Sequence, residues 1–330
     1  MSMMQTRRRF LSTLSLVGAA GFLHPSSTLA AEDRLETTSL RLAKHTDMCM
    51  APQFLIDDLL HTEGFTDINY VDTKLGEIAH SVGSNTVDMS LGYVQQFLVR
   101  IEAGDPITMV AGVMVGCVEV FAQDGIRSIA ELKGKKVGVR GLSDHGLLSV
   151  MIAHVGLDPA KDIEWINDPN PVKAFQDGKI DAFEAVPPGS QEMRARKIGH
   201  VIVNNAVDRP WSDYFCCMLG VNREFVRNNP VATKRALRAF LKATDFCVAE
   251  PERAARRLVD GGFTLHYDRA LEAIHENVFD KWREYNAEDT VRFYALRLQE
   301  VGFVKTPPQK LIVDSTDWRF FNELKRELKA

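Results

Sequence analysis

The chain has 330 residues, of which 44 are acidic and 40 basic, so its formal net charge is −4 at pH 7. With 45% hydrophobic and 25% charged residues the composition is that of an ordinary globular protein. It offers no basic stripe of the kind that nucleic-acid binding requires, which disfavours that class of function. About 300 residues beyond the N-terminal segment exceed what one hydrophobic core usually organises, so we expect two lobes.

The N-terminus has the pattern of an export signal. Three arginines at 7–9 precede an apolar run at 14–23, and small residues lead to Ala30 and Ala31. The paired arginines followed by Phe10 favour the twin-arginine route, and the run is shorter than the roughly 20 residues that a membrane span needs. No cysteine follows it that could carry a lipid anchor. We therefore predict a signal peptide over residues 1–31, cleavage near Ala30 or Ala31, and a periplasmic mature chain. Loss of the three arginines takes the net charge from −4 to −7.

Strands and helices alternate in the first third of the mature chain. Residues 40–44 alternate like a strand, and residues 52–61 carry apolar side chains at helical spacing. The unit then repeats, with strands at 68–71 and 87–91, helices at 75–82 and 94–102, and β-rich runs at 107–115 and 118–122. This order predicts a mostly parallel sheet with helices on both faces.

A second round of the same kind follows. It opens with a short helix at 128–134, a strand at 136–140 and a helix at 144–154, and continues through 163–166, 172–176, 180–184, 192–198 and 201–203. From Pro230 onward the pattern is amphipathic helix, at 232–248, 252–259, 270–282 and 290–301. We therefore predict an α/β protein whose first lobe comprises 32–120 and 220–330, with the C-terminal helices, and whose second lobe comprises 121–219.

The five cysteines are Cys49, Cys117, Cys216, Cys217 and Cys247, an odd number for an exported protein, so at least one stays free or pairs between chains. Their spacing matches no zinc signature. We interpret them mainly as buried small apolar residues. The alternatives are a disulfide between Cys117 and Cys216 or Cys217, and a soft-metal site at residues 48–50.

Six short motifs occur in an order that is typical of a known family. They are Ala51-Pro52, the segment 83–90, the segment 102–107 with Val110-Ala111, the segment 129–139 with its Leu-Lys-Gly-Lys-Lys-Val-Gly-Val run, Gly156-Leu157-Asp158-Pro159, and the segment 178–182. Each motif is weak alone. Together, from about Leu40 to Val301, they make the chain resemble the NMT1/THI5-like or SsuA-like substrate-binding proteins, which serve ABC importers of sulfonates, nitrate, bicarbonate, pyrimidines and related solutes.

The resemblance implies the type II periplasmic-binding-protein fold, in which two α/β lobes are joined by crossing strands and hold the ligand between them. Residues 118–122 would cross into the second lobe and residues 215–221 would cross back, which makes Cys117 and the Cys216-Cys217 pair possible neighbours. The implied partners are a small solute and the permease and ATPase subunits of an importer in the inner membrane. We expect a monomer without cofactor or metal.

Candidate ligand-binding residues follow from the rule that ligands of open α/β sheets lie beyond the carboxyl ends of strands. These are His45, Asp47, Cys49, Gly92, Tyr93, Arg140, Ser143, Asp144, His145, Glu184, Pro187, Trp211 and Tyr214. In the family an equivalent Gly-Ser-x-x-His step contributes to the pocket, and Gly141, Ser143 and His145 approximate it.

The candidates differ in what they indicate about the solute. The helix start after Ser143 favours an anion, whereas Asp144 disfavours a bare oxyanion. Tyr93, Trp211 and Tyr214 favour a planar or heteroaromatic solute. The alternatives are capping for Ser143 and Asp144 and core packing for the aromatic residues.

We expect no enzymatic activity, since no nucleophile elbow, zinc-protease motif or P-loop is present. Two alternatives stay open. One is a pyrimidine-precursor enzyme resembling the yeast THI5 proteins, which use a bound cofactor and their own histidine. That chemistry is associated with a cysteine cluster, which this sequence does not reproduce beyond Cys216-Cys217. The other is a ligand-sensing partner of a membrane receptor.

Overall fold

The computed structural model describes residues 34–45, 47–140 and 145–329. The predicted signal peptide and the candidates Ser143 and Asp144 therefore lie outside the described residues. Residues 35–330 form one compact unit. Among the described residues, no helix combines the length and apolar character that a membrane crossing would need.

The first sheet has five strands in the order β2-β1-β3-β10-β4. They are β1 (Ser39–Lys44), β2 (Asp67–Asp72), β3 (Met89–Tyr93), β4 (Ile107–Met114) and β10 (Cys217–Asn222). Strand β1 pairs parallel with β2 and β3, whereas β10 lies antiparallel between β3 and β4. Every residue of the internal strands β3 and β10 is buried, as expected for strands covered on both faces, and so is every residue of the edge strand β4.

The second sheet repeats this plan with shorter strands in the order β7-β6-β8-β5-β9. They are β5 (Glu119–Ala122), β6 (Lys136–Val139), β7 (Glu164–Asn167), β8 (Ala182–Ala185) and β9 (His200–Asn204). Strand β6 is parallel to β7 and β8, and β5 is antiparallel to β8 and β9. Four strands of each sheet thus run in one direction. The reversed strand is β10 in the first sheet and β5 in the second. Each of them follows a connection from the other sheet.

Short helices pack against these sheets. Beside the first sheet lie the 3-10 helices η1 (Met48–Phe54) and η2 (Leu75–Glu77) and the helices α1 (Asp57–Thr62), α2 (Ile78–Gly83) and α3 (Val94–Glu102). Between the strands of the second sheet come η3 (Ile129–Leu132), α4 (Gly146–His154), α5 (Pro171–Gln176) and α6 (Gly189–Ala195), and η4 (Trp211–Asp213) follows β9. The predicted helix at 52–61 is in fact split between η1 and α1, because Leu55 leaves the helical backbone conformation.

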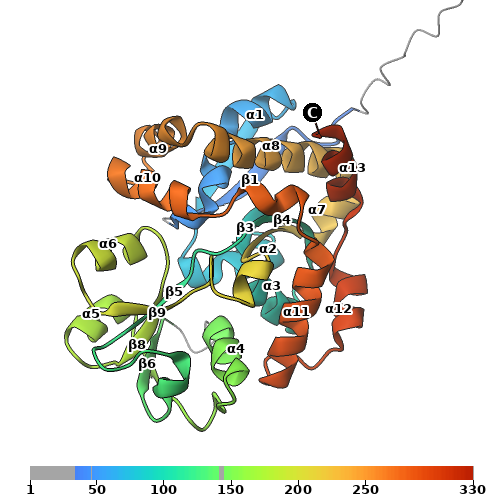
Figure 1. Cartoon of the computed structure of the whole chain (residues 1–330). Helices are drawn as coiled ribbons and strands as arrows, with labels where there is room; N and C mark the ends of the chain where they lie inside the picture. The colour runs from blue at the N-terminus through green and yellow to red at the C-terminus, as the bar shows by residue number, and fades with distance from the viewer. Residues whose placement is uncertain (1–33, 46, 141–144, 330) are drawn as a thin grey trace, which may run out of the picture. The chain divides into compact units, whose positions relative to one another are not determined.

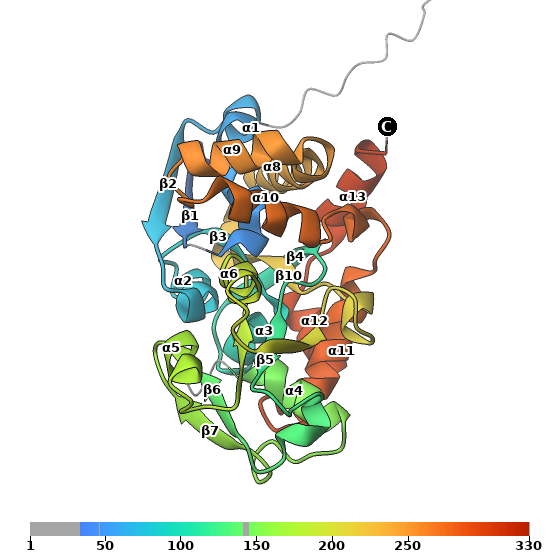
Figure 2. The same cartoon turned by 60° about the vertical axis from the view of Figure 1, so that its left-hand side comes forward.

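The C-terminal third is helical, as the sequence predicted. It comprises α7 (Arg223–Asn228), α8 (Pro230–Ala249), α9 (Pro251–Asp260), α10 (Tyr267–Glu276), η5 (Asp280–Arg283), α11 (Ala287–Glu300), α12 (Pro308–Ser315) and α13 (Arg319–Glu327). Helices α8, α12 and α13 contact β4, and α8 also contacts η1, so these helices belong with the first sheet (Figure 1). Figure 2 shows α8, α9 and α10 over β1 and β3.

The predicted continuous helix at 270–282 ends at Glu276 for an identifiable reason. Val278 instead pairs with Val115 in an antiparallel bridge, and each residue donates its N–H to the carbonyl of the other, at 3.0 and 3.3 Å. The helices α7, α12 and α13 were not predicted. The predicted helices α8 and α9 each start with a proline, and so does α12. Proline suits the first position of a helix.

Two connections join the sheets, over residues 115–118 and 205–216. They lie side by side: the N–H of Asn205 donates to the carbonyl of Val118 at 3.0 Å. Gly116 has a φ of +77°, and a Cβ there would lie 2.3 Å from the Cα of Ala206. A larger residue would therefore push the two connections apart.

The N-terminus of α8 supports a first stability prediction. Both carboxylate oxygens of Glu36 accept hydrogen bonds, from the N–H of Val231 and of Ala232, each at 3.0 Å. These N–H groups belong to the first turn of a 20-residue helix and have no acceptor within it. Glu36→Ala should therefore lower the free energy of unfolding by about 1 kcal/mol. Urea unfolding measures this, with the exposed Asp124→Ala as control; equal stabilities of the two variants would contradict it.

Candidate ligand pocket between the two sheets

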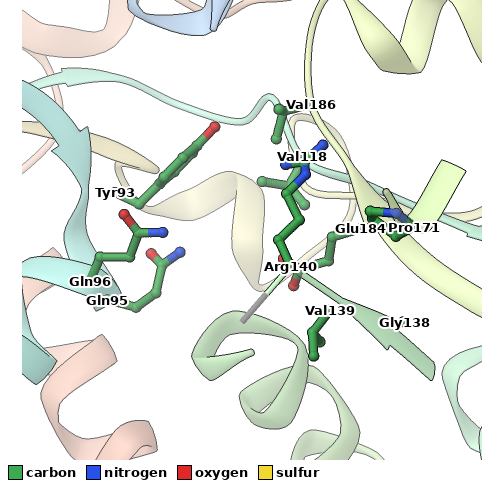
Figure 3. Close-up of a pocket in the computed structure, with 10 residues that line it drawn as sticks. All are labelled: Tyr93, Gln95, Gln96, Val118, Gly138, Val139, Arg140, Pro171, Glu184 and Val186. Atoms are coloured by element: carbon green, nitrogen blue, oxygen red, sulfur yellow. The ribbon is translucent and has the colours of Figure 1, made fainter. Parts of the chain in front are cut away.

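A pocket lies where the two sheets face each other. From the first sheet it is lined by Tyr93, the last residue of β3, and by Gln95 and Gln96 in the first turn of α3. The opposite wall consists of Gly138, Val139, Arg140, Pro171, Glu184 and Val186, and Val118 of a connection completes it. Figure 3 shows Tyr93 and the two glutamines across the pocket from Arg140 and Glu184. The pocket is narrow in this structure, with a cavity volume of about 40 Å³.

The strand ends explain this gathering of polar groups. Tyr93, Arg140 and Glu184 all lie at or just beyond the carboxyl end of a strand, and the two sheets present these ends to each other. Three of the sequence candidates thus line one pocket. Gln95, Gln96 and Pro171 were missed, because only the residues directly after each strand were considered and not the first turn of the next helix. That first turn is a signal that the sequence did contain.

The lining has a definite chemical character. Arg140 is an exposed cation, whereas Glu184 is a half-buried carboxyl group on the same side. The amides of Gln95 and Gln96 can donate and accept hydrogen bonds, and Tyr93 provides an aromatic ring. The valines supply apolar walls. The lining thus offers a ligand charged groups, hydrogen-bond donors and acceptors, an aromatic ring and apolar surface.

Tyr93 also belongs to a buried cluster behind the pocket. Its hydroxyl donates a short hydrogen bond to Asp47 Oδ2 and lies 3.2 Å from Cys49 Sγ. Cys49 in turn donates its thiol proton to Asp47 Oδ1, 2.8 Å away. Burial, with the neighbouring Cys49, raises the pKa of the Asp47 carboxyl well above its usual value, which favours its uncharged form. Burial and the adjacent Asp47 likewise raise the pKa of Tyr93.

All five cysteines are buried, as the sequence analysis predicted. Cys117 Sγ lies 3.7 Å from Cys216 Sγ and 4.0 Å from the Tyr93 hydroxyl. The Sγ atoms of Cys49, Cys117 and Cys217 all lie within 4.8 Å of one another. The predicted neighbours Cys117 and Cys216 do meet, but all five cysteines are free thiols in the structure.

Several other candidates lie apart from this pocket. His45 borders a separate hollow with Lys44, Asp72 and Phe263, and burial lowers its pKa to about 4. Tyr214 borders another, where its ring stacks on Phe293 with 4.0 Å between the centroids.

The remaining candidates have packing roles. Trp211 is buried against His154 and Phe293. His145 packs on Trp165 and Phe303 at the start of α4. Gly92 lies inside β3, where a Cβ would be 2.7 Å from Phe97. Pro187 is buried, and its carbonyl accepts the N–H of Met48 at 3.1 Å. That hydrogen bond joins η1 to the loop after β8.

The model of the NMT1/THI5-like family matches residues 67–254, more than half of the chain. The chain belongs to this family. Over 208 residues it is 26% identical to the 4-amino-5-hydroxymethyl-2-methylpyrimidine phosphate synthase THI5 of Saccharomyces cerevisiae, which covers 57% of this chain and 59% of that protein. The match thus spans less than two thirds of the yeast protein's length.

Solved structures identify the fold of this NMT1/THI5-like protein. The nitrate-binding protein NrtA of Synechocystis PCC 6803 superposes with a TM-score of 0.76 at 15% identity, covering 90% of both chains. The alkanesulfonate-binding protein SsuA of Xanthomonas axonopodis pv. citri, bound to MOPS, gives 0.69 at 15% identity and covers 83% of this chain and 96% of that one. The predicted periplasmic-binding-protein fold is therefore confirmed. Identities this low show the fold and not the ligand.

Polar contacts bridge the two sheets of this NMT1/THI5-like protein beside the pocket. Arg194 and Gln191 on α6 both bind Glu276 on α10, with Arg194 Nη2 2.5 Å from Glu276 Oε1 and Gln191 Nε2 2.7 Å from Oε2. Arg194 also pairs with the buried Glu119. Helix α6 follows β8 of the second sheet, whereas α10 packs on η1 of the first. These contacts hold the sheets together at one edge.

Glu276→Gln should weaken solute binding up to about fivefold, because a partly exposed ion pair contributes about 1 kcal/mol or less. The matched control is Glu288→Gln, whose partner Arg292 lies on the same helix. Titration calorimetry with the identified solute compares the two variants. Identical affinities for both would show that the α6–α10 contact does not stabilise the bound state.

Proposed function

We propose that this protein is the extracytoplasmic solute-binding component of an ABC importer. It captures a small solute that is planar or heteroaromatic and can carry an anionic group. The observation that carries this proposal is the pocket lining, in which Tyr93 and two glutamines of one sheet face Arg140 and Glu184 of the other. A solute that contacts both walls stabilises the closed arrangement, which a permease can then recognise.

The proposal includes the division into lobes and the export route. The first lobe comprises residues 32–120 and 220–330, the second comprises 121–219, and residues 1–31 are a signal peptide of the twin-arginine type. The two solved structures reported above are named for binding nitrate and alkanesulfonate, and NrtA is named as a periplasmic protein. This supports a periplasmic location. Permease and ATPase subunits are the partners that such a component requires.

A thermal-shift screen of residues 32–330 tests the proposal. The compounds are pyrimidines, flavins, aromatic carboxylates, sulfonates, nitrate and bicarbonate. A ligand at a thousandfold excess over its Kd stabilises the native state by about 4 kcal/mol, which is easily detected. A hit with a planar ring supports both the clamp and the solute class. A nitrate or sulfonate hit keeps the clamp and overturns the solute class, and the absence of any hit contradicts the proposal for these solutes.

A synthase is the second candidate function, because the yeast relative is named as one. The fate of the solute separates the two. After overnight incubation the protein is denatured and the released solute is analysed by mass spectrometry. Unchanged solute supports a binding protein, whereas a new product or a modified protein side chain supports an enzyme. A sensing role would appear as binding to a receptor in place of an importer permease.

A further inference from the structure

Three buried cysteines converge from segments that are distant in sequence. Cys49 lies at the start of η1, Cys117 in the first connection, and Cys217 at the start of β10. Their sulfur atoms all lie within 4.8 Å of one another, and the three residues are at most 6% exposed. Strand β10 causes this meeting, since it pairs Cys217 with Tyr93 on one side and with Met114 on the other. The result is a buried group of three sulfur donors.

This grouping differs from ordinary packing of cysteine as a small apolar residue. Cys247 in α8, which is also buried but outside the group of sulfur donors found among the described residues, is an example of such packing. The three-cysteine cluster instead has polar neighbours: Asp47 accepts from Cys49, and the Tyr93 hydroxyl lies near both Cys49 and Cys117. Polar groups that fix the orientation of a sulfur atom are typical of a second shell around a metal ion.

The donor set determines which ion fits. Three sulfur atoms at about 2.3 Å from one ion lie about 4 Å apart, so the observed grouping needs only a small contraction. Thiolates select soft cations such as Cu(I). Zinc is almost always four-coordinate in structural sites, whereas the cluster found among the described residues has three members.

We infer that Cys49, Cys117 and Cys217 form a binding site for one Cu(I) ion. Each thiol that ligates the ion loses its proton, so the ion enters while up to three protons leave to solvent. No change of oxidation state is involved, because the ion is bound and released as Cu(I). The hydrogen bond from the Cys49 thiol to Asp47 is lost with that proton, whereas the Cys49 N–H still donates to Asp47 Oδ1 at 3.4 Å and the Tyr93 hydroxyl still donates to Oδ2. Since Tyr93 also lines the solute pocket, the ion lies directly behind the proposed solute, although its binding does not depend on that proposal.

Anaerobic titration of the reduced mature chain with Cu(I), in competition with a chromophoric Cu(I) chelator, tests the inference. The wild-type protein should remove one equivalent of Cu(I) from the chelator. Each of Cys49→Ser, Cys117→Ser and Cys217→Ser should lower Cu(I) affinity at least about tenfold, whereas Cys247→Ser should leave it unchanged. X-ray absorption should show three sulfur neighbours and no nitrogen or oxygen. Failure to withdraw Cu(I), retention of full affinity in the triple variant, or preferential binding of Zn²⁺ would each overturn the inference.

Two further measurements cover the case in which a serine variant does not fold. Native mass spectrometry of the wild-type protein should show one added copper. After mild denaturation, the copper-loaded protein should have three fewer rapidly alkylated thiols than the copper-free protein. The solute screen is repeated on the copper-free protein. If copper does not bind but a solute still produces a thermal shift, only this inference is wrong. If copper binds but no solute produces a thermal shift, only the proposed function is wrong.

Discussion

Replacing Arg140 by alanine is expected to weaken solute binding roughly ten- to a hundredfold. Arg140 is the cationic group of the pocket and stands on the wall formed by the second sheet. A hydrogen bond from a charged donor contributes about 1.5–3 kcal/mol, which corresponds to that change in affinity. Calorimetric titration with the solute found in the screen measures the effect. Because Arg140 is exposed, the variant should keep the stability of the wild-type protein.

The opposite wall provides the companion variant. Gln95→Ala removes an amide from the first-sheet side and should also lower affinity, by about 0.5–1.5 kcal/mol for a neutral hydrogen bond. Arg227→Ala is the matched control for Arg140→Ala, since Arg227 is exposed on α7 and forms an ion pair with Glu224 of the same helix. If only one wall mattered for affinity, the solute would not bridge the sheets, and the clamp mechanism would be wrong.

The second large effect is expected from Asn205, which ties the two connections together. Its side chain is 1% exposed, and Oδ1 accepts the N–H groups of Cys117 and Val118 at 2.8 and 2.7 Å. Asn205→Ala leaves both buried N–H groups without that acceptor, and each such loss costs about 1–3 kcal/mol. We expect the free energy of unfolding to fall by about 2–5 kcal/mol, measured by urea denaturation.

Asn69→Ala serves as the control for this variant. Asn69 lies in β2 and is exposed, so its replacement should change stability by less than about 0.5 kcal/mol. If Asn205→Ala were as stable as this control, the connections would be held by their backbone hydrogen bonds alone. The position of Asn205 would then have no energetic significance for the junction.

The strand and helix pattern was largely predictable because each element carries its own periodicity. Residues 107–115, for example, form a β-rich run, and β4 occupies 107–114 with every residue buried. The break at Leu55 and the end of α10 at Glu276 were not predictable, since both depend on backbone conformation or on pairing with distant residues. The periodicity of a segment indicates which of its residues are buried, but not which distant segment it pairs with.

The candidate site was likewise predictable only in part. The rule that ligands bind at strand ends found Tyr93, Arg140 and Glu184, because it needs only the order of strands. It also selected His45, Trp211 and Tyr214, which the structure places elsewhere. The cysteine cluster could not be found from spacing, since its members are separated by dozens of residues and meet only because β10 inserts between β3 and β4.

The insertion of β10 between β3 and β4 also affects the order in which the protein can fold. Strands β3 and β4 do not pair with each other; both pair with β10, which begins more than a hundred residues after β4 begins. The first sheet is thus left with a gap until the chain has passed through the whole second sheet, and closing so long a loop is slow. The second sheet uses only residues 119–204 and has a small core of its own. The second sheet can therefore form first on the ribosome, whereas the first sheet can be completed only after β10 has been synthesised.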